Sequence, residues 1–153
     1  MKVLIVGAGI AGITIASFLK KRGVKVTLIE KNKGLKRGGF VIGLWNNGRR
    51  VINELGLEKE IDKKGKQLNK YKIITGEGNL IREYSFDKLS KEYGPIVTFI
   101  QRADLLKILS NSLKNVKIKY KTTIDHISQN KKEAIVKFSD KKIEKFDIIV
   151  GAD

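Results

Sequence analysis

The feature that most constrains this chain is a short apolar strand followed directly by three closely spaced glycines. Val3–Val6 is an uninterrupted apolar run, which is typical of a strand buried on both faces of a parallel sheet. The glycines occupy positions 7, 9 and 12, and apolar residues then recur at roughly helical spacing as far as Lys21. We therefore predict a strand, a tight turn and a helix that begins near Gly9 and ends before Gly23.

A second strand with an acidic residue at its end follows this helix. Residues 24–29 are mostly apolar, and Glu30 comes directly after them. The order strand, turn, helix, strand defines one βαβ unit. Glu30 lies 18 positions after Gly12, close to the spacing of about 20 at which a carboxylate accepts hydrogen bonds from a ribose. A carboxylate at this position also repels a 2′-phosphate, which disfavours NADP as the ligand of this turn.

Each of the three glycines has a separate physical role in binding a dinucleotide. Gly7 allows the sharp turn out of the strand, Gly9 leaves room for a pyrophosphate beside the backbone, and Gly12 lets the helix pack closely on the sheet. The start of the helix adds unpaired N–H groups and a partial positive charge. An ordinary glycine-rich turn would lack this surrounding βαβ order, so we interpret the segment as a dinucleotide-binding site. Its candidate residues are Gly7, Ala8, Gly9, Ile10, Ala11, Gly12 and Glu30.

The remaining strand patterns predict an α/β fold of the Rossmann-like type. Four parallel strands are expected, at Val3–Val6, Lys25–Ile29, Val116–Tyr120 and Ile148–Val150. An antiparallel hairpin over Thr123–Phe138 would form the crossover between the last two. A second hairpin, Tyr71–Ser85, fits no parallel sheet, and we assign it to a separate small antiparallel sheet.

The segments around the second hairpin are predicted from shorter patterns. Asn46 or Asn47 is expected to cap a helix that Gly56 ends. Trp45, just before it, is interpreted as a core residue, and Phe86–Pro95 as a loop. The other predicted elements are strands at Phe40–Leu44 and Val97–Ile100, a short helix at Glu58–Lys63 and an amphipathic helix at Arg102–Leu113.

Four segments, in order along the chain, resemble the flavoprotein aromatic hydroxylases, which are para-hydroxybenzoate hydroxylase-like monooxygenases that bind FAD. They are "GAGIAGITIASFLKKRGVKVTLIE", "RGGFVIGLWNNGRRVINELGL", "FIQRADLLKIL" and "FDIIVGAD". The first is shared by many flavoproteins, whereas the second and third together are more specific to this family. The chain departs from the family at Lys31, where arginine is common, and at Asn47, where proline is frequent.

The resemblance implies a function and further cofactor residues. The chain would be the FAD-binding part of a monooxygenase that uses NADH or NADPH and dioxygen to hydroxylate or epoxidise a small organic substrate. The arginine of the third segment contacts the cofactor in this family, and a planar guanidinium suits phosphate or ribityl oxygens. No catalytic residue is identified. The residues that the resemblance adds to the candidate FAD site are Lys31, Arg37, Gly38, Arg102 and Asp153.

The resemblance also implies a domain organisation. Residues 1–153 would be one FAD-binding domain, incomplete at its C-terminus, with about 66–100 an inserted hairpin region on the substrate side. We expect the full-length protein to be the enzyme and the 153-residue chain alone to be inactive. Two alternatives stay open: a flavin-dependent isoprenoid (geranylgeranyl-type) reductase, which shares the early motifs, and a truncated dinucleotide-binding fragment without activity. Oxygen uptake during NAD(P)H oxidation would separate a monooxygenase from a reductase.

Composition excludes several other classes of protein. The net charge of +16 allows contact with nucleic acid or an anionic membrane, but the lysines alternate with apolar residues and no nucleic-acid-binding motif or membrane segment accompanies them. We therefore expect no nucleic acid partner. The absence of cysteine excludes disulfides, thiolate metal sites and a cysteine nucleophile, and it favours a cytoplasmic location. No metal site is expected, and the single histidine, His126, is interpreted as structural.

Overall fold

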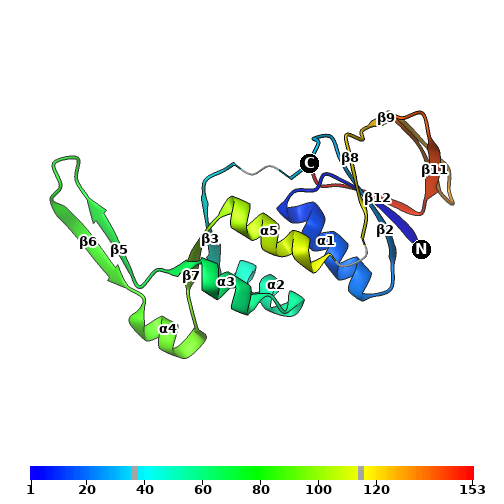
Figure 1. Ribbon diagram of the computed structural model, residues 1–153. Coiled ribbons are helices and arrows are strands. Elements are labelled where there is room, and N and C mark those ends of the chain that lie inside the picture. Colours follow the sequence, from blue (N-terminus) through cyan, green and yellow to red (C-terminus); the bar gives the residue numbers. More distant parts are fainter. Residues whose placement is uncertain (36–37, 114–115) are drawn as a thin grey trace. The chain divides into compact units, whose positions relative to one another are not determined.

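The computed structural model describes residues 1–35, 38–113 and 116–153 (Figure 1). The chain divides into two compact units: the first comprises residues 1–38 and 105–153, and the second comprises residues 39–104. Helix α5 (Arg102–Ser112) begins in the second unit and continues in the first. Among the described residues, no helix is long and apolar enough to cross a membrane.

The first unit is built on a four-stranded parallel sheet, as the sequence predicts. Because all four strands run in the same direction, their carboxyl ends meet at one edge of the sheet, where ligands of open α/β sheets bind. The helix predicted after the first strand is α1 (Ile10–Lys21). The strands lie in the order β12 (Ile148–Gly151), β1 (Lys2–Val6), β2 (Lys25–Glu30) and β8 (Ile118–Tyr120).

Both faces of this sheet are covered, which explains why β1 is apolar along its whole length. Successive side chains of a strand point to opposite faces. Leu4 joins a buried cluster with Phe138 and Phe146, whereas Ile5 lies on the side of α1, close to Gly12. Ile13 and Ala16 of α1 are fully buried. The parallel sheet, whose carboxyl ends carry the candidate site, therefore lies between α1 on one face and the Leu4 cluster on the other.

A three-stranded antiparallel meander covers the face that Leu4 occupies. The predicted crossover hairpin is confirmed as β9 (Ile124–Gln129) and β10 (Ala134–Phe138). A third strand, β11 (Ile143–Phe146), pairs with β10 and was not predicted from the sequence. Its four residues include two charged side chains and adjoin the apolar run of β12, so periodicity alone does not separate the two strands.

The second unit consists of two antiparallel sheets and short helices. The helix that Gly56 ends is confirmed: Gly56 adopts a left-handed conformation at the end of α2 (Asn46–Leu55). The buried Arg49 of α2 forms a salt bridge with Asp62 of α3 (Glu58–Lys64), with 2.7 Å between Nη1 and Oδ1. The elements are β3 (Val41–Trp45), α2 (Asn46–Leu55), α3 (Glu58–Lys64), β4 (Lys66–Gln67), β5 (Lys70–Ile74), β6 (Leu80–Ser85), α4 (Asp87–Tyr93) and β7 (Val97–Gln101).

Three local predictions in this unit are wrong. The segment predicted as a loop contains α4, a helix of seven residues of which none is buried. Its apolar residues at helical spacing are too few to predict a helix from the sequence. Neither asparagine caps α2: Trp45 is the N-cap residue, and the side chain of Asn47 accepts a hydrogen bond from the neighbouring Gly48 N–H. Trp45 is not in the core but 53% exposed, with its ring edge-on to that of Phe86.

The predicted hairpin of the second unit is confirmed as a separate two-stranded sheet, β5 with β6. Figure 1 shows it as a long ribbon that extends from α4 and β7 of the same unit. Every residue of both strands is exposed. Six large apolar side chains are among them: Tyr71, Ile73, Ile74, Leu80, Ile81 and Tyr84.

Candidate nucleotide-binding site

The turn after β1 has a backbone that requires glycine at position 7. Gly7 has a φ of +106°, a conformation that L side chains rarely adopt. Its N–H donates to the carbonyl of Ile29 at 2.9 Å. A Cβ at Gly7 would lie 2.6 Å from the carbonyl oxygen of Ala152, which follows β12. Gly7 therefore serves the sharp turn, as predicted, and also the close approach of the chain after β12.

Gly12 allows the first turn of α1 to rest directly on the backbone of this turn. A Cβ at Gly12 would lie 1.9 Å from the carbonyl oxygen of Gly7 and 3.4 Å from Cγ2 of Ile5. No side chain can occupy that space without moving the backbone. The close packing predicted for Gly12 is thus present, and its tightest contact is with the turn and not with the sheet.

Gly9 faces open space. A Cβ built there meets only the carbonyl oxygen of Ala152, at 3.9 Å. Gly9 is the N-cap residue of α1, and no side chain caps this helix or adds an acidic group to its first turn. Backbone N–H groups at an uncapped helix start bind anions such as phosphate. The space at Gly9 and the uncapped helix fit a pyrophosphate.

The carboxylate of Glu30 lies against the same turn. Its Oε2 accepts a hydrogen bond from Ala8 N–H at 3.0 Å. Its Oε1 accepts two from Asn32, one from the backbone N–H at 2.9 Å and one from the side-chain amide at 2.6 Å. The strand end that the sequence assigns to ribose binding is therefore joined to the glycine-rich turn.

The surroundings keep Glu30 ionised. Partial burial acts to raise its pKa, but the backbone hydrogen bonds from Asn32 and Ala8, the Asn32 amide and the charge of Lys31 outweigh burial and hold the pKa below the ordinary value of 4.5. Tyr120, which pairs with Glu30 in the sheet, has a raised pKa because of burial and this nearby negative charge. An ionised carboxylate accepts ribose hydroxyls without competition from its own proton.

The structure brings most of the other candidates to the same unit. Lys31 is exposed beside Glu30, and Asp153 is exposed after Ala152, whose N–H donates to the carbonyl of Val6 at 2.8 Å. Gly38 is exposed and belongs to the first unit. Arg37 lies outside the described residues.

Arg102 belongs to the second unit, where it begins α5. Its backbone N–H donates to the carbonyl of Phe40 at 3.1 Å. The aliphatic part of its side chain lies over Gly39, because a Cβ at Gly39 would be only 2.8 Å from Cδ of Arg102. Gly39, with a φ of +142°, therefore leaves room for this side chain.

Asn32 and Ala152 were missed by the sequence analysis. Asn32 stands two positions beyond Glu30, within reach of its carboxylate, and asparagine commonly bonds to nearby groups at strand ends and turns. That local preference is a weak signal. Ala152 contributes its backbone, and no residue type indicates such a contact.

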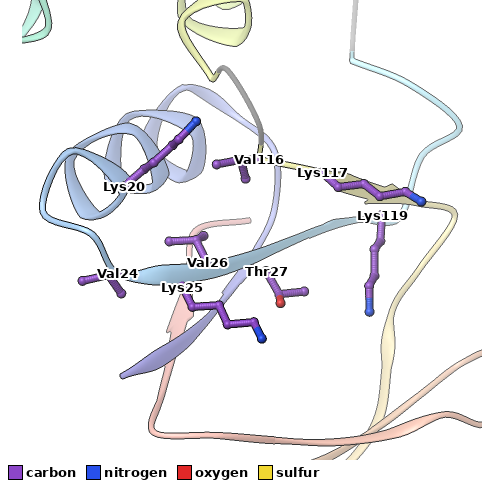
Figure 2. A pocket seen from close by; sticks show the side chains of 8 residues that line it. All are labelled: Lys20, Val24, Lys25, Val26, Thr27, Val116, Lys117 and Lys119. Carbon is purple, nitrogen blue, oxygen red and sulfur yellow. The ribbon is translucent and has the colours of Figure 1, made fainter.

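A pocket of about 360 Å³ lies at the opposite end of β2 from Glu30. Figure 2 shows Lys20 on one side of β2 and Lys25 and Lys119 on the other, so that their ammonium groups do not converge. This arrangement does not form a site for one small anion. The pocket is lined by Lys20, Val24, Lys25, Val26, Thr27, Val116, Lys117 and Lys119.

The βαβ geometry, the open Gly9 and the anchored carboxylate define a dinucleotide-binding site of the Rossmann-like class. The FAD binding domain family matches the chain over residues 1–153, and the chain belongs to this family. The resemblance inferred from the four sequence segments is thereby confirmed.

Curated relatives are flavin-dependent monooxygenases. One from Legionella longbeachae is 26% identical over 153 residues, which cover 100% of this chain and 39% of the relative. The FAD-dependent monooxygenase andE of Emericella variicolor is 30% identical over 155 residues, covering 100% of this chain and 33% of that protein. The chain thus spans between 33% and 39% of the length of these two relatives and corresponds to their FAD-binding part.

Solved structures confirm the fold class. The tetracycline destructase Tet(55) is 27% identical with a TM-score of 0.80, over 99% of this chain and 38% of its own. The tetrameric 2-methyl-3-hydroxypyridine-5-carboxylic acid oxygenase is 25% identical with a TM-score of 0.84, over 99% and 39%. Klebsiella pneumoniae HpxO, complexed with FAD and uric acid, is 23% identical with a TM-score of 0.87, over 100% and 39%, and supports the fold alone.

We predict that Gly12→Ala strongly destabilises the protein, whereas Gly34→Ala does not. The Cβ at Gly12 would meet backbone at 1.9 Å, and overpacking of this kind costs about 1–3 kcal/mol or more. Gly34 has nothing within 4 Å of the corresponding position and no positive φ. Urea unfolding of both variants measures the difference. Equal stability of the two would show that the turn relaxes freely.

We also predict that Glu30 contributes to stability only above its folded-state pKa. Because this pKa is lowered in the folded protein, the unfolded chain binds the proton more readily, and the contribution is complete above pH 4.5. It is lost as the pH falls through the folded pKa. The gap in unfolding free energy between the wild type and Glu30→Gln should therefore be constant near neutral pH and shrink below 4.5. Denaturant titrations across this range measure it, and a gap that widens on acidification would contradict the assignment.

Proposed function

We propose that this chain is the FAD-binding part of a monooxygenase that takes electrons from NADH or NADPH and acts on a small organic substrate. The observation that carries the proposal is the open, uncapped helix start at Gly9 beside an ionised Glu30. Relatives of this chain that are named flavin-dependent monooxygenases support the choice of reaction over that of a flavin-dependent reductase.

The residues of the chain have separate roles in this proposal. The N–H groups at the start of α1 bind the pyrophosphate, and the absence of a side chain at Gly9 lets it approach. Glu30 accepts a hydroxyl of the adenosine ribose. By resemblance, Arg102 supplies a further contact to phosphate or ribityl oxygens, for which its planar donors are suited. When bound, FAD supplies the transfer of electrons from the nicotinamide to dioxygen that monooxygenation requires.

The first test identifies the nucleotide. The intact protein, purified and then denatured by heat, is expected to release FAD, identified by mass, because Glu30 disfavours a ligand with a 2′-phosphate at this turn. Oxygen uptake during oxidation of NADH or NADPH then distinguishes a monooxygenase from a reductase. Release of NADP, or of no nucleotide from a well-folded protein, would contradict the proposal.

The second test is Gly9→Leu, which we predict abolishes FAD binding and preserves the fold. The leucine side chain would occupy the open space assigned to the pyrophosphate, and among described residues other than its chain neighbours the nearest atom to its Cβ position is the carbonyl oxygen of Ala152, at 3.9 Å. Flavin fluorescence measures binding, and circular dichroism measures the fold. Gly34→Ala serves as the control that should bind as the wild type does. Unchanged FAD affinity in Gly9→Leu would show that the pyrophosphate lies elsewhere.

A further inference from the structure

Both carboxylate oxygens of Glu30 accept hydrogen bonds from the protein itself. An ionised carboxylate has about four lone-pair sites, two on each oxygen. The two donors of Asn32 fill Oε1, and Ala8 N–H fills one site of Oε2. The remaining acceptor site is therefore on Oε2, the oxygen that lies against the glycine-rich turn. A carboxylate held in this way is oriented and not free to rotate.

The backbone of Asn32 is itself fixed by the segment that follows β8. Lys121 N–H donates to the carbonyl of Asn32 at 3.1 Å, and Thr122 N–H donates to the carbonyl of Glu30 at 3.0 Å. Lys121 has a φ of +53°, a left-handed conformation that is uncommon for a residue other than glycine. Such strained positions persist where the surrounding structure holds them, often near ligand sites. The two β-strand ends together fix Asn32 relative to Glu30.

We propose that Asn32 is a positioning residue that holds Oε1 of Glu30, so that a single ribose hydroxyl of the adenosine binds at Oε2. This inference rests on the proposed function, because it assumes a dinucleotide at the glycine-rich turn. The lowered pKa of Glu30 agrees with it, since the same donors stabilise the charged form. The titratable groups near Glu30 are Lys31 on its own segment, which is charged, and Tyr120 on β8, whose raised pKa keeps it neutral.

A Glu30 carboxylate oriented by Asn32 has a consequence for ligand affinity that an asparagine with a purely structural role would not have. If Oε1 is occupied, only one of the two ribose hydroxyls should contribute to affinity through Glu30. If Asn32 moved aside on binding, both oxygens would be open and both hydroxyls would contribute. The probes are ADP, 2′-deoxy-ADP and 3′-deoxy-ADP, titrated calorimetrically into the intact protein after removal of its flavin.

In the wild-type protein, one deoxy probe should bind roughly ten-fold more weakly than ADP, and the other should bind like ADP. In Asn32→Ala the ratio of the affinities for the two deoxy probes should fall towards one, because the carboxylate loses one of the donors that orient it. In the Glu30→Gln background, Asn32→Ala should have no further effect on the ratio. Asn130→Ala is the control: its side chain makes local hydrogen bonds too, but it accepts them, from Lys132 N–H and Glu133 N–H in the meander, and its loss should leave all three affinities unchanged.

The outcomes separate this inference from the proposed function. Two results would overturn the role of Asn32 while leaving the nucleotide site in place. One is an equal loss of affinity for both deoxy probes, relative to ADP, in the wild type. The other is an unchanged ratio of the two deoxy-probe affinities in a folded Asn32→Ala protein. Failure of the wild type to bind ADP contradicts the nucleotide site and the inference together. Should Asn32→Ala fail to fold, Asn32→Asp keeps the shape of the side chain, and its added negative charge beside Glu30 should weaken the binding of ADP. Unchanged ADP affinity in that variant also overturns the inference.

Discussion

The contact on which this structure depends is the approach of two backbones at Gly7. The start of α1 rests on the carbonyl of Gly7 through Gly12, and the chain after β12 lies against Gly7 from the side of Ala152. Hydrogen bonds to Ile29 and Val6 fix the turn and the β12 end to the sheet. These contacts bring the end of β12, the end of β2 and the start of α1 to one place. The binding groups then need little further adjustment, because they are backbone N–H groups and one anchored carboxylate.

The sequence predicts this part of the molecule well because each requirement there selects a residue type. A positive φ and the absence of a Cβ select glycine, burial on both faces selects an apolar run, and a ribose selects an acidic residue at a strand end. Other features select no such type. The exposed α4 buries nothing, β11 is short and half charged, and Ala152 acts through its backbone. Asn32 was missed because its role depends on the turn after β8, far away in the sequence.

Two lysines of the first unit pair with one partly buried carboxylate, although the chain carries +16 overall. Glu144 of β11 accepts hydrogen bonds from Lys119 of β8 and Lys2 of β1, and these bonds hold its pKa below the ordinary value of 4.5. The same two ammonium groups lie over the rings of Phe146 and Phe138. Lysine stems thus cover aromatic core residues while their charges join the meander to the parallel sheet. This use of lysine is structural, and it agrees with the diverging lysines of the pocket in Figure 2.

A site made mostly of backbone also accounts for the pattern of similarity to known proteins. Tet(55) shares 27% of residues with this chain but superimposes with a TM-score of 0.80. Backbone N–H groups of α1 are present whatever the side chains of Ile10 and Ala11 are, so those positions can change without loss of phosphate binding. In the glycine-rich turn, Gly7, Gly12 and the carboxylate of Glu30 are fixed by contacts that another residue type would break. By contrast, the β5–β6 hairpin exposes both faces, and a two-stranded hairpin is marginally stable on its own in water. The side-chain contacts within that hairpin lie at the surface: Lys70 and Lys72 pair with Glu83, and the rings of Tyr71 and Tyr84 lie side by side. The tightest contacts described here are therefore those of the glycine-rich turn, where backbone meets backbone.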